Sequence, residues 1–206
     1  MSKFYTNLVL LGDDILYRGY EHGQRVQYRD RSSPVLFFVP QAQTKDTKFR
    51  TLDGRRAYKK QFSGAREARE VLKQYENTDG LEVHGYERFV YQHINQQFPN
   101  DIDYDMSMMK IYTIDIEVAC ENGFPDVEAS AEEMLCLTIK DFNTKKIITW
   151  GTREFTPPEG VEYRVFWTEQ EMLQDFHKWW SDNTPDIITG WNNNLYDIPY
   201  ICRRIE

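Results

Sequence analysis

The stretch Lys110–Val118 constrains the fold most, because it is an apolar segment with two acids near its centre. No Gly or Pro interrupts it and β-branched residues dominate, which predicts a buried strand. Asp115 and Glu117 are two residues apart, so on a strand they lie on one face with Cα atoms roughly 6.5–7 Å apart. The opposite face is then filled by Tyr112, Ile114, Ile116 and Val118.

Two carboxylates on one face of an apolar strand repel each other, and desolvation raises the cost of ionising both. A divalent cation relieves this repulsion, and hard ions such as Mg²⁺ and Mn²⁺ favour carboxylate oxygens. Two such ions held about 3.5–4 Å apart form the arrangement that cleaves phosphodiesters. The alternative is an edge strand whose acids, Asp115 and Glu117, simply face water.

The composition indicates a folded protein rather than a disordered chain. The 206 residues are 40% hydrophobic and include 12 Phe, 13 Tyr and 5 Trp, enough for a packed core. The chain has no apolar run of the ~18 residues needed to span a membrane, and its start lacks a signal-peptide pattern, so we expect a cytosolic protein. Cys120, Cys136 and Cys202 are spaced as reduced thiols rather than as zinc ligands or a disulfide pair.

A basic segment, residues 45–69, stands out from an acidic chain. It carries nine Lys or Arg against three acids, a charge of +6 within a total of −8, which leaves −14 elsewhere. Tyr58 and Phe62 alternate with these cations, and such aromatics can stack on bases while cations hold phosphates. One hypothesis is therefore a non-catalytic module that binds RNA or single-stranded DNA; the alternative is a solvated face with core aromatics. The cations that would carry this binding are Arg55, Arg56, Lys59 and Lys60.

The first half of the chain reads as a small, mainly antiparallel domain, residues 1–105. Residues 3–40 are expected to form one antiparallel sheet, and Ser63 is expected to cap a helix that runs through Glu76. Residues 89–98 fit either a strand or a helix. The acidic stretch 99–105 reads as a linker that ends the domain.

The second half, residues 106–206, reads as an α/β sheet domain, which makes the whole chain α/β (α+β overall). Thr168 and Glu171 predict a capping box at the start of a buried helix. The strands expected in addition to 110–118 are 134–142, 146–150, 163–167 and 185–190.

A second acidic motif follows the last of these strands. Asp197 comes after a polar loop and near the start of a terminal helix, where it can face the end of a neighbouring strand. Ligands of α/β sheets bind at such places. On its own, Asp197 would be an ordinary acid stabilised by the helix macrodipole.

Together the two motifs resemble the first two motifs of the DEDD-type 3′→5′ proofreading exonucleases. The resemblance is in particular to family B DNA polymerases of T-even-type bacteriophages. It rests on the strand with Asp115 and Glu117 and on the later run from Gly190 through Asn192, Tyr196 and Asp197. The Gly123–Pro125 run after the first motif and the Asp197–Tyr200 run strengthen it.

The resemblance implies a polymerase N-terminal domain over 1–105 and the first part of a ribonuclease-H-like exonuclease domain over 106–206. Asp115 would bridge both metal ions, Mg²⁺ or Mn²⁺, and Glu117 would bind a metal and orient the attacking water. Asp197 would bind the second metal. The residues that would contact the 3′-terminal nucleotides are Asn192, Phe124 and Tyr196.

The same resemblance implies a DNA-directed DNA polymerase that proofreads during replication in the cytoplasm of an infected bacterium, away from any membrane. Its partners would be a single-stranded 3′ end, primer-template DNA, the remainder of the polymerase chain and replication proteins such as a sliding clamp. RNA is implied as well, because phage relatives bind their own message.

The sequence also departs from the family pattern. The third motif, a Tyr-x3-Asp helix that supplies the last carboxylate, is absent, and Glu206 is the one acid after Asp197. The polymerase palm motifs are absent too. We therefore expect a fragment, or one piece of a split polymerase, that is weak or inactive as an exonuclease by itself.

Overall fold

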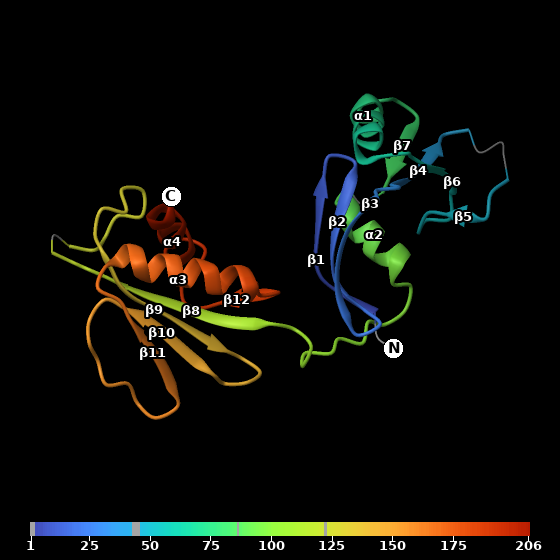
Figure 1. Ribbon diagram of the computed structural model, residues 1–206. Coiled ribbons are helices and arrows are strands. Elements are labelled where there is room, and N and C mark those ends of the chain that lie inside the picture. Colours follow the sequence, from blue (N-terminus) through green and yellow to red (C-terminus); the bar gives the residue numbers. More distant parts are fainter. Residues whose placement is uncertain (1–2, 43–45, 86, 122) are drawn as a thin grey trace. The chain divides into compact units, whose positions relative to one another are not determined.

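The computed structural model describes residues 3–42, 46–85, 87–121 and 123–206. The chain forms two compact units that divide between Tyr104 and Asp105 (Figure 1). Each unit has its own sheets and helices. Within the described ranges, no helix is both long and apolar enough to cross a membrane.

The first unit begins with a three-stranded antiparallel sheet of β1 (Lys3–Leu11), β2 (Asp14–Glu21) and β3 (Gln24–Arg31). Its strands follow one another through tight turns, as expected from the turn residues in the sequence. Phe4, Ile15 and Tyr17 are fully buried in its core.

The expectation of one sheet over residues 3–40 is wrong, because β4 (Val35–Pro40) belongs to a second sheet. That sheet has the order β5-β6-β4-β7 and also contains β5 (Phe49–Arg50), β6 (Arg56–Gln61) and β7 (Leu81–His84). Here β4 pairs with a strand on each side. A wholly apolar strand is better buried between two neighbours than at the edge of the first sheet.

The first helix is α1 (Ala65–Tyr75), and its N-cap is Gly64 rather than Ser63. Asp13, in the turn between β1 and β2, accepts a hydrogen bond from the Arg66 amide at 2.8 Å. A carboxylate from a distant turn therefore satisfies the helix N-terminus, which no local pattern predicts. Residues 89–98, which the sequence left open, contain the helix α2 (Phe89–Gln97).

The second unit is built on a five-stranded mixed sheet with the order β11-β10-β9-β8-β12. β8 (Ile111–Val118), β9 (Met134–Asp141) and β10 (Ile147–Gly151) are antiparallel neighbours. β11 (Val161–Val165) and β12 (Ile187–Thr189) each pair in parallel with the adjacent strand. The expected α/β (α+β overall) class is confirmed.

Two helices cover one face of this sheet, α3 (Glu169–Asp182) and α4 (Asp197–Ile205). Ile114 and Ile116 of β8 pack in one core with Met172 and Phe176 of α3 and with Tyr200 of α4. Figure 1 shows α3 lying across the strands. The other face of β8 is left for the acids.

The expected cap of α3 is present: the Thr168 hydroxyl accepts a hydrogen bond from the Glu171 amide at 3.2 Å. The Glu171 carboxylate accepts from the amide of Trp167, one residue before the cap. We predict that Thr168→Ala lowers the free energy of unfolding by about 1 kcal/mol, because one helix N–H loses its acceptor. Urea denaturation measures this, and Thr168→Ser serves as the control. An unchanged midpoint for the alanine variant would contradict the prediction.

Candidate active site

Asp115 and Glu117 lie on the exposed face of β8, while Ile114 and Ile116 between and beside them are buried. The predicted alternation is therefore present. β8 is not an edge strand over its first three residues, because β12 pairs with Ile111 to Thr113. Since β12 ends there, the edge of β8 beside Asp115 carries no strand partner among the described residues.

Asp197 is the first residue of α4 and is 3% exposed, unlike the two acids of β8. Burial raises the pKa of the Asp197 carboxyl above its usual range, and the negative charge of nearby Asp115 raises it further. Backbone hydrogen bonding at Asp197 itself and at Ile116 lowers the pKa in part. Two acids roughly eighty residues apart in sequence thus interact through space, at the open edge of β8.

Glu117 and Tyr196 belong to the same region. Burial raises the pKa of the Tyr196 hydroxyl, and the charges of Asp197 and Glu117 are among the smaller causes. The Tyr196 ring packs against the Phe124 ring with centroids 4.9 Å apart. Phe124 is 82% exposed, so much of its ring is accessible to a planar ligand group.

Asn192 shapes the loop before α4. Its backbone is in the left-handed region with φ of 62°, and its carbonyl accepts hydrogen bonds from the amides of Leu195 and Tyr196, each at 3.0 Å. An Asn tolerates this conformation better than most residues. The Asn192 side chain is exposed, and its contact with a nucleotide stays a prediction.

The packing of Gly190, which was named from the sequence only as part of the second motif, and of Asn193 was not foreseen. Gly190 lies so close to β8 that an added Cβ would be 2.6 Å from the Ile114 carbonyl oxygen. The same Cβ would be 2.2 Å from the side-chain oxygen of Asn193, which is buried. A glycine directly after a short strand was the available signal.

Asp115, Glu117 and Asp197 supply carboxylate oxygens, which are the donors that a hard divalent cation prefers. Repulsion between Asp115 and Asp197 is what such an ion would relieve. Within the described residues, however, no group of three or more His, Cys, Asp or Glu side chains is gathered closely enough to hold a metal ion. The chemistry of Asp115, Glu117 and Asp197 therefore fits a cation, while their separation exceeds that of a closed coordination sphere.

Glu206 does not complete the site. Asp197 begins α4 and Glu206 follows its last residue, so the two are nine positions apart in the sequence. At 1.5 Å per residue this is roughly 13 Å along the helix axis. The acid at the far end of the helix cannot reach the open edge of β8.

The basic segment is less available to a ligand than its composition indicates. Arg55 forms ion pairs with Asp53 at 2.7 Å and with Glu82 at 2.5 Å. Phe62, one of the aromatics expected to stack on bases, is 3% exposed and belongs to the core. Lys59 and Lys60 are neighbours on β6 and point to opposite faces.

These contacts support the alternative that was left open, a solvated face with a core aromatic. Arg56 has Asp46 near its guanidinium, at 3.8 Å. Lys45, the first cation of the segment, lies outside the described residues. RNA or single-stranded DNA binding by this segment stays a prediction.

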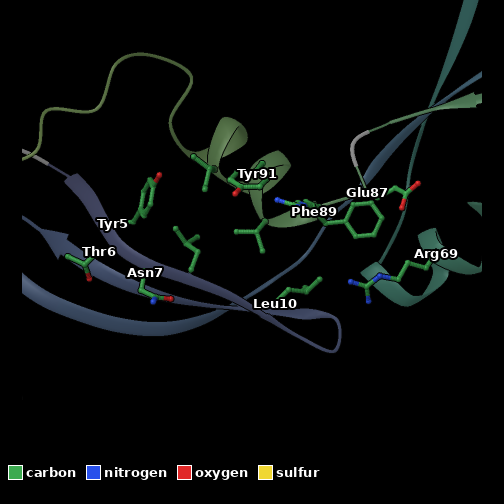
Figure 2. Close-up of a pocket in the computed structure, with 12 residues that line it drawn as sticks. Tyr5, Thr6, Asn7, Leu10, Arg69, Glu87, Phe89 and Tyr91 are labelled. Atoms are coloured by element: carbon green, nitrogen blue, oxygen red, sulfur yellow. The ribbon is translucent and has the colours of Figure 1, made fainter. Parts of the chain in front are cut away.

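The first unit also contains a cavity of about 550 Å³ between β1 and the start of α2. Figure 2 shows Tyr5 and Asn7 on one side of it and Phe89 and Tyr91 on the other, with Arg69 at one end. The four cations proposed to bind nucleic acid do not line this cavity.

Comparison with known proteins identifies a family for a region that includes the second unit. A family model described as DNA polymerase family B, exonuclease domain, matches residues 86–206, more than half of the chain. The whole chain is 27% identical over 238 residues to a DNA-directed DNA polymerase of Escherichia phage RB69 and 24% identical over 237 residues to that of Enterobacteria phage T4. It spans 26% and 25% of these two proteins, about a quarter of their length.

Other relatives match about half of the chain. The DNA polymerase catalytic subunit of Human herpesvirus 7 (strain JI) is 34% identical over 100 residues, which cover 46% of this chain and 10% of that protein. The family's exonuclease domain is consistent with the expected ribonuclease-H-like α/β fold.

The raised pKa of Asp197 gives a prediction about stability and pH. The folded carboxyl binds its proton more tightly than the unfolded one, whose pKa is near 3.8. The stability of the metal-free protein should therefore fall as the pH rises from about this value through the raised pKa. Asp197→Asn removes this loss, so at pH 7 the variant should be more stable than the unmodified protein, with a smaller difference at pH 4.

Urea denaturation across this pH range, with a chelator present, measures the effect. Asp186→Asn serves as a control, since Asp186 also lies at an end of β8 and accepts a hydrogen bond from the Lys110 amide. A variant Asp197→Asn that loses stability equally at both pH values would show a structural carboxylate instead.

We predict that Gly190→Ala lowers the free energy of unfolding by roughly 1–3 kcal/mol, because the new methyl group forces the loop away from β8. The exposed residue Asn194 of the same loop provides the control, and Asn194→Ala should be nearly neutral. Thermal unfolding measures both, and equal melting temperatures would contradict the predicted close approach.

Proposed function

Because this chain belongs to DNA polymerase family B, whose exonuclease domain covers residues 86–206, we propose that it carries part of a proofreading site. The reaction is hydrolysis of the 3′-terminal phosphodiester of DNA in a replicative DNA polymerase. The chain spans about a quarter of its phage relatives, so polymerase activity is a proposal for a longer parent protein.

The observation that carries this proposal is the electrostatic interaction between Asp115 and Asp197. A fold gains nothing in stability from burying one carboxylate beside another, because both desolvation and repulsion oppose it. Such pairs are found where a cation or a reacting group requires them. Here Asp115 is exposed on β8, where a nucleic-acid end would have access.

In the proposed site, Asp115, Glu117 and Asp197 hold two divalent ions, Mg²⁺ or Mn²⁺. Bound ions of this kind lower the pKa of a coordinated water and stabilise negative charge on a phosphate. Glu117, which is exposed on the same face as Asp115, would orient the attacking water and accept a proton from it. A cation bound there would favour the charged form of Asp197, whose pKa is raised by burial and by the charge of Asp115.

The aromatic pair of Phe124 and Tyr196 positions the substrate in this proposal. Phe124 is exposed and supported from one side by Tyr196, so its free face can stack on the terminal base. Stacking is tolerant of base identity, as a proofreading site requires. Asn192 lies a few residues before Tyr196 and would bond the terminal nucleotide.

The partners that follow are a single-stranded DNA 3′ end, primer-template DNA and the remainder of the polymerase chain, which would supply the missing carboxylate. Contact with RNA and with a sliding clamp stays a prediction from the family resemblance. With one carboxylate fewer, the second ion binds weakly, so this chain alone should be a weak exonuclease or inactive.

The decisive experiment measures Mn²⁺ binding by calorimetry for the unmodified protein, Asp115→Ala and Asp197→Ala. We expect the unmodified protein to bind Mn²⁺ and each substitution to lower the affinity by about tenfold or more, since each removes a charged ligand. Glu162→Ala, which alters a carboxylate on β11, should bind as the unmodified protein does. Equal binding by all four proteins would overturn the proposal.

A stability measurement gives a further prediction. Without metal, Asp115→Asn should be neutral or slightly stabilising, because repulsion of Asp197 disappears. With Mn²⁺ the order should reverse, since the ion stabilises the folded state of the unmodified protein alone. A large fall in melting temperature for Asp115→Asn in metal-free buffer would mean that the acid is structural.

Exonuclease activity is measured as release of the 3′ nucleotide from a labelled single-stranded oligonucleotide in the presence of Mg²⁺ or Mn²⁺. The chain alone should release little or none. Robust digestion that Asp115→Ala abolishes would support the exonuclease assignment and contradict the prediction that three carboxylates are insufficient.

A further inference from the structure

A half-buried ion pair joins the two helices of the second unit to the strand next to β8. Glu169, in the first turn of α3, binds Arg204 of α4 through both carboxylate oxygens; Arg204 Nε lies 2.8 Å from Glu169 Oε1. The side chains of Glu169 and Arg204 are 12% and 25% exposed. A forked guanidinium–carboxylate pair of this kind fixes direction as well as distance.

The same carboxylate also contacts the sheet. Glu169 Oε1 accepts a hydrogen bond from the Met134 amide at 2.9 Å. Met134 lies at a β-bulge, because Glu117 pairs with Cys136 while Val118 pairs with Met134. A bulge re-aims the side chains beside it, and here the neighbouring side chain on β8 is Glu117.

Arg204 makes a third connection, to the loop before β9. Its Nη1 donates a hydrogen bond to the Ser130 carbonyl at 3.1 Å. Ser130 is buried and has φ of 42°, a conformation that the surrounding contacts must hold in place. One turn earlier in the same helix, the Tyr200 hydroxyl donates a hydrogen bond to the Glu132 carbonyl at 2.7 Å.

The position of Arg204 on α4 relates this network to the acids. Asp197 and Arg204 are seven residues apart, which places them two turns apart on one face of the helix, roughly 10 Å along its axis. A small rotation or shift of α4 therefore moves both side chains together. Arg203, the next residue, points elsewhere and pairs with the exposed Glu128 at 2.7 Å.

We propose that Glu169 and Arg204 are a positioning pair that sets the separation of Asp197 from Asp115 and Glu117. One end of the network holds α4, which begins at Asp197, and the other holds the bulge opposite Glu117. Neither residue touches the substrate in this assignment. The consequence for metal binding rests on the proposed exonuclease function, whereas the positioning itself does not.

The first arm of the test uses the metal-free protein and ¹H–¹⁵N spectra. In Arg204→Gln, the amide resonances of Glu117 and Asp197 should shift, and the Met134 amide should exchange faster with solvent. Arg203→Gln, which removes a cation one residue away, should leave all three nearly unchanged. Indistinguishable spectra for the two variants at these amides would overturn the proposal, whatever the metal does.

The second arm measures Mn²⁺ affinity by calorimetry at a temperature at which every variant is folded. Arg204→Gln and Glu169→Gln should each weaken binding about tenfold, as changes to groups that support metal ligands do. Arg204→Lys keeps the charge and should recover much of the affinity. Ile148→Val, which loosens the same core on β10 rather than on α4 or β8, controls for general destabilisation and should bind normally.

The two arms separate two kinds of failure. If the unmodified protein binds Mn²⁺ no better than Asp115→Ala, the exonuclease proposal fails, while the metal-free spectra still decide whether the pair positions the acids. If binding depends on Asp115 but not on Arg204 or Glu169, the positioning proposal fails and the exonuclease proposal stands.

Discussion

Burial of the Asp197 carboxyl beside Asp115 opposes folding, so the remainder of the second unit must hold these two groups together. The apolar core between the sheet and its helices does so. Ile114 and Ile116 anchor β8 on the face opposite its acids, and Tyr200 and Ile201 anchor α4 directly after Asp197. Each acid is thus attached to an element whose other side is buried. The apolar side chains gain free energy when they are buried, and this gain offsets the cost of holding the two carboxyl groups near each other.

The geometry of one short strand makes this arrangement possible. β12 pairs with β8 over three residues and then ends, which leaves room for the Gly190–Asp197 loop at the edge of β8. A longer β12 would occupy the edge where Asp197 interacts with Ile116 and Asp115. Gly190 permits the close approach, and the left-handed backbone of Asn192 turns the chain toward α4.

The parts of this structure that the sequence predicted are those with a local cause. Alternation along β8 follows from Ile114 to Glu117 themselves, and the cap of α3 from Thr168 and Glu171 three residues apart. The family resemblance assigned Asp197 to the same site as Asp115, and the charge of Asp115 does act on Asp197. What the sequence could not supply are pairings between distant segments. The capping of α1 by Asp13 and the transfer of β4 to a second sheet depend on contacts that no spacing encodes.

The basic segment illustrates the same limit from the other side. Its composition indicates a surface rich in free cations, yet Arg55 is neutralised by Asp53 and by Glu82, which lies on a different strand. Phe62 is in the core, so its ring is not accessible to a ligand even though it alternates with cations in the sequence. The net charge of a segment therefore overestimates the number of cations available to bind a ligand when acids from distant segments form ion pairs with them. β8 shows the converse. The Asp115 side chain is exposed, and the distant side chain that folds near it is a second carboxyl group, that of Asp197, rather than a cation. Two acidic groups that folding brings together are therefore a stronger indication of function than the net charge of a sequence segment.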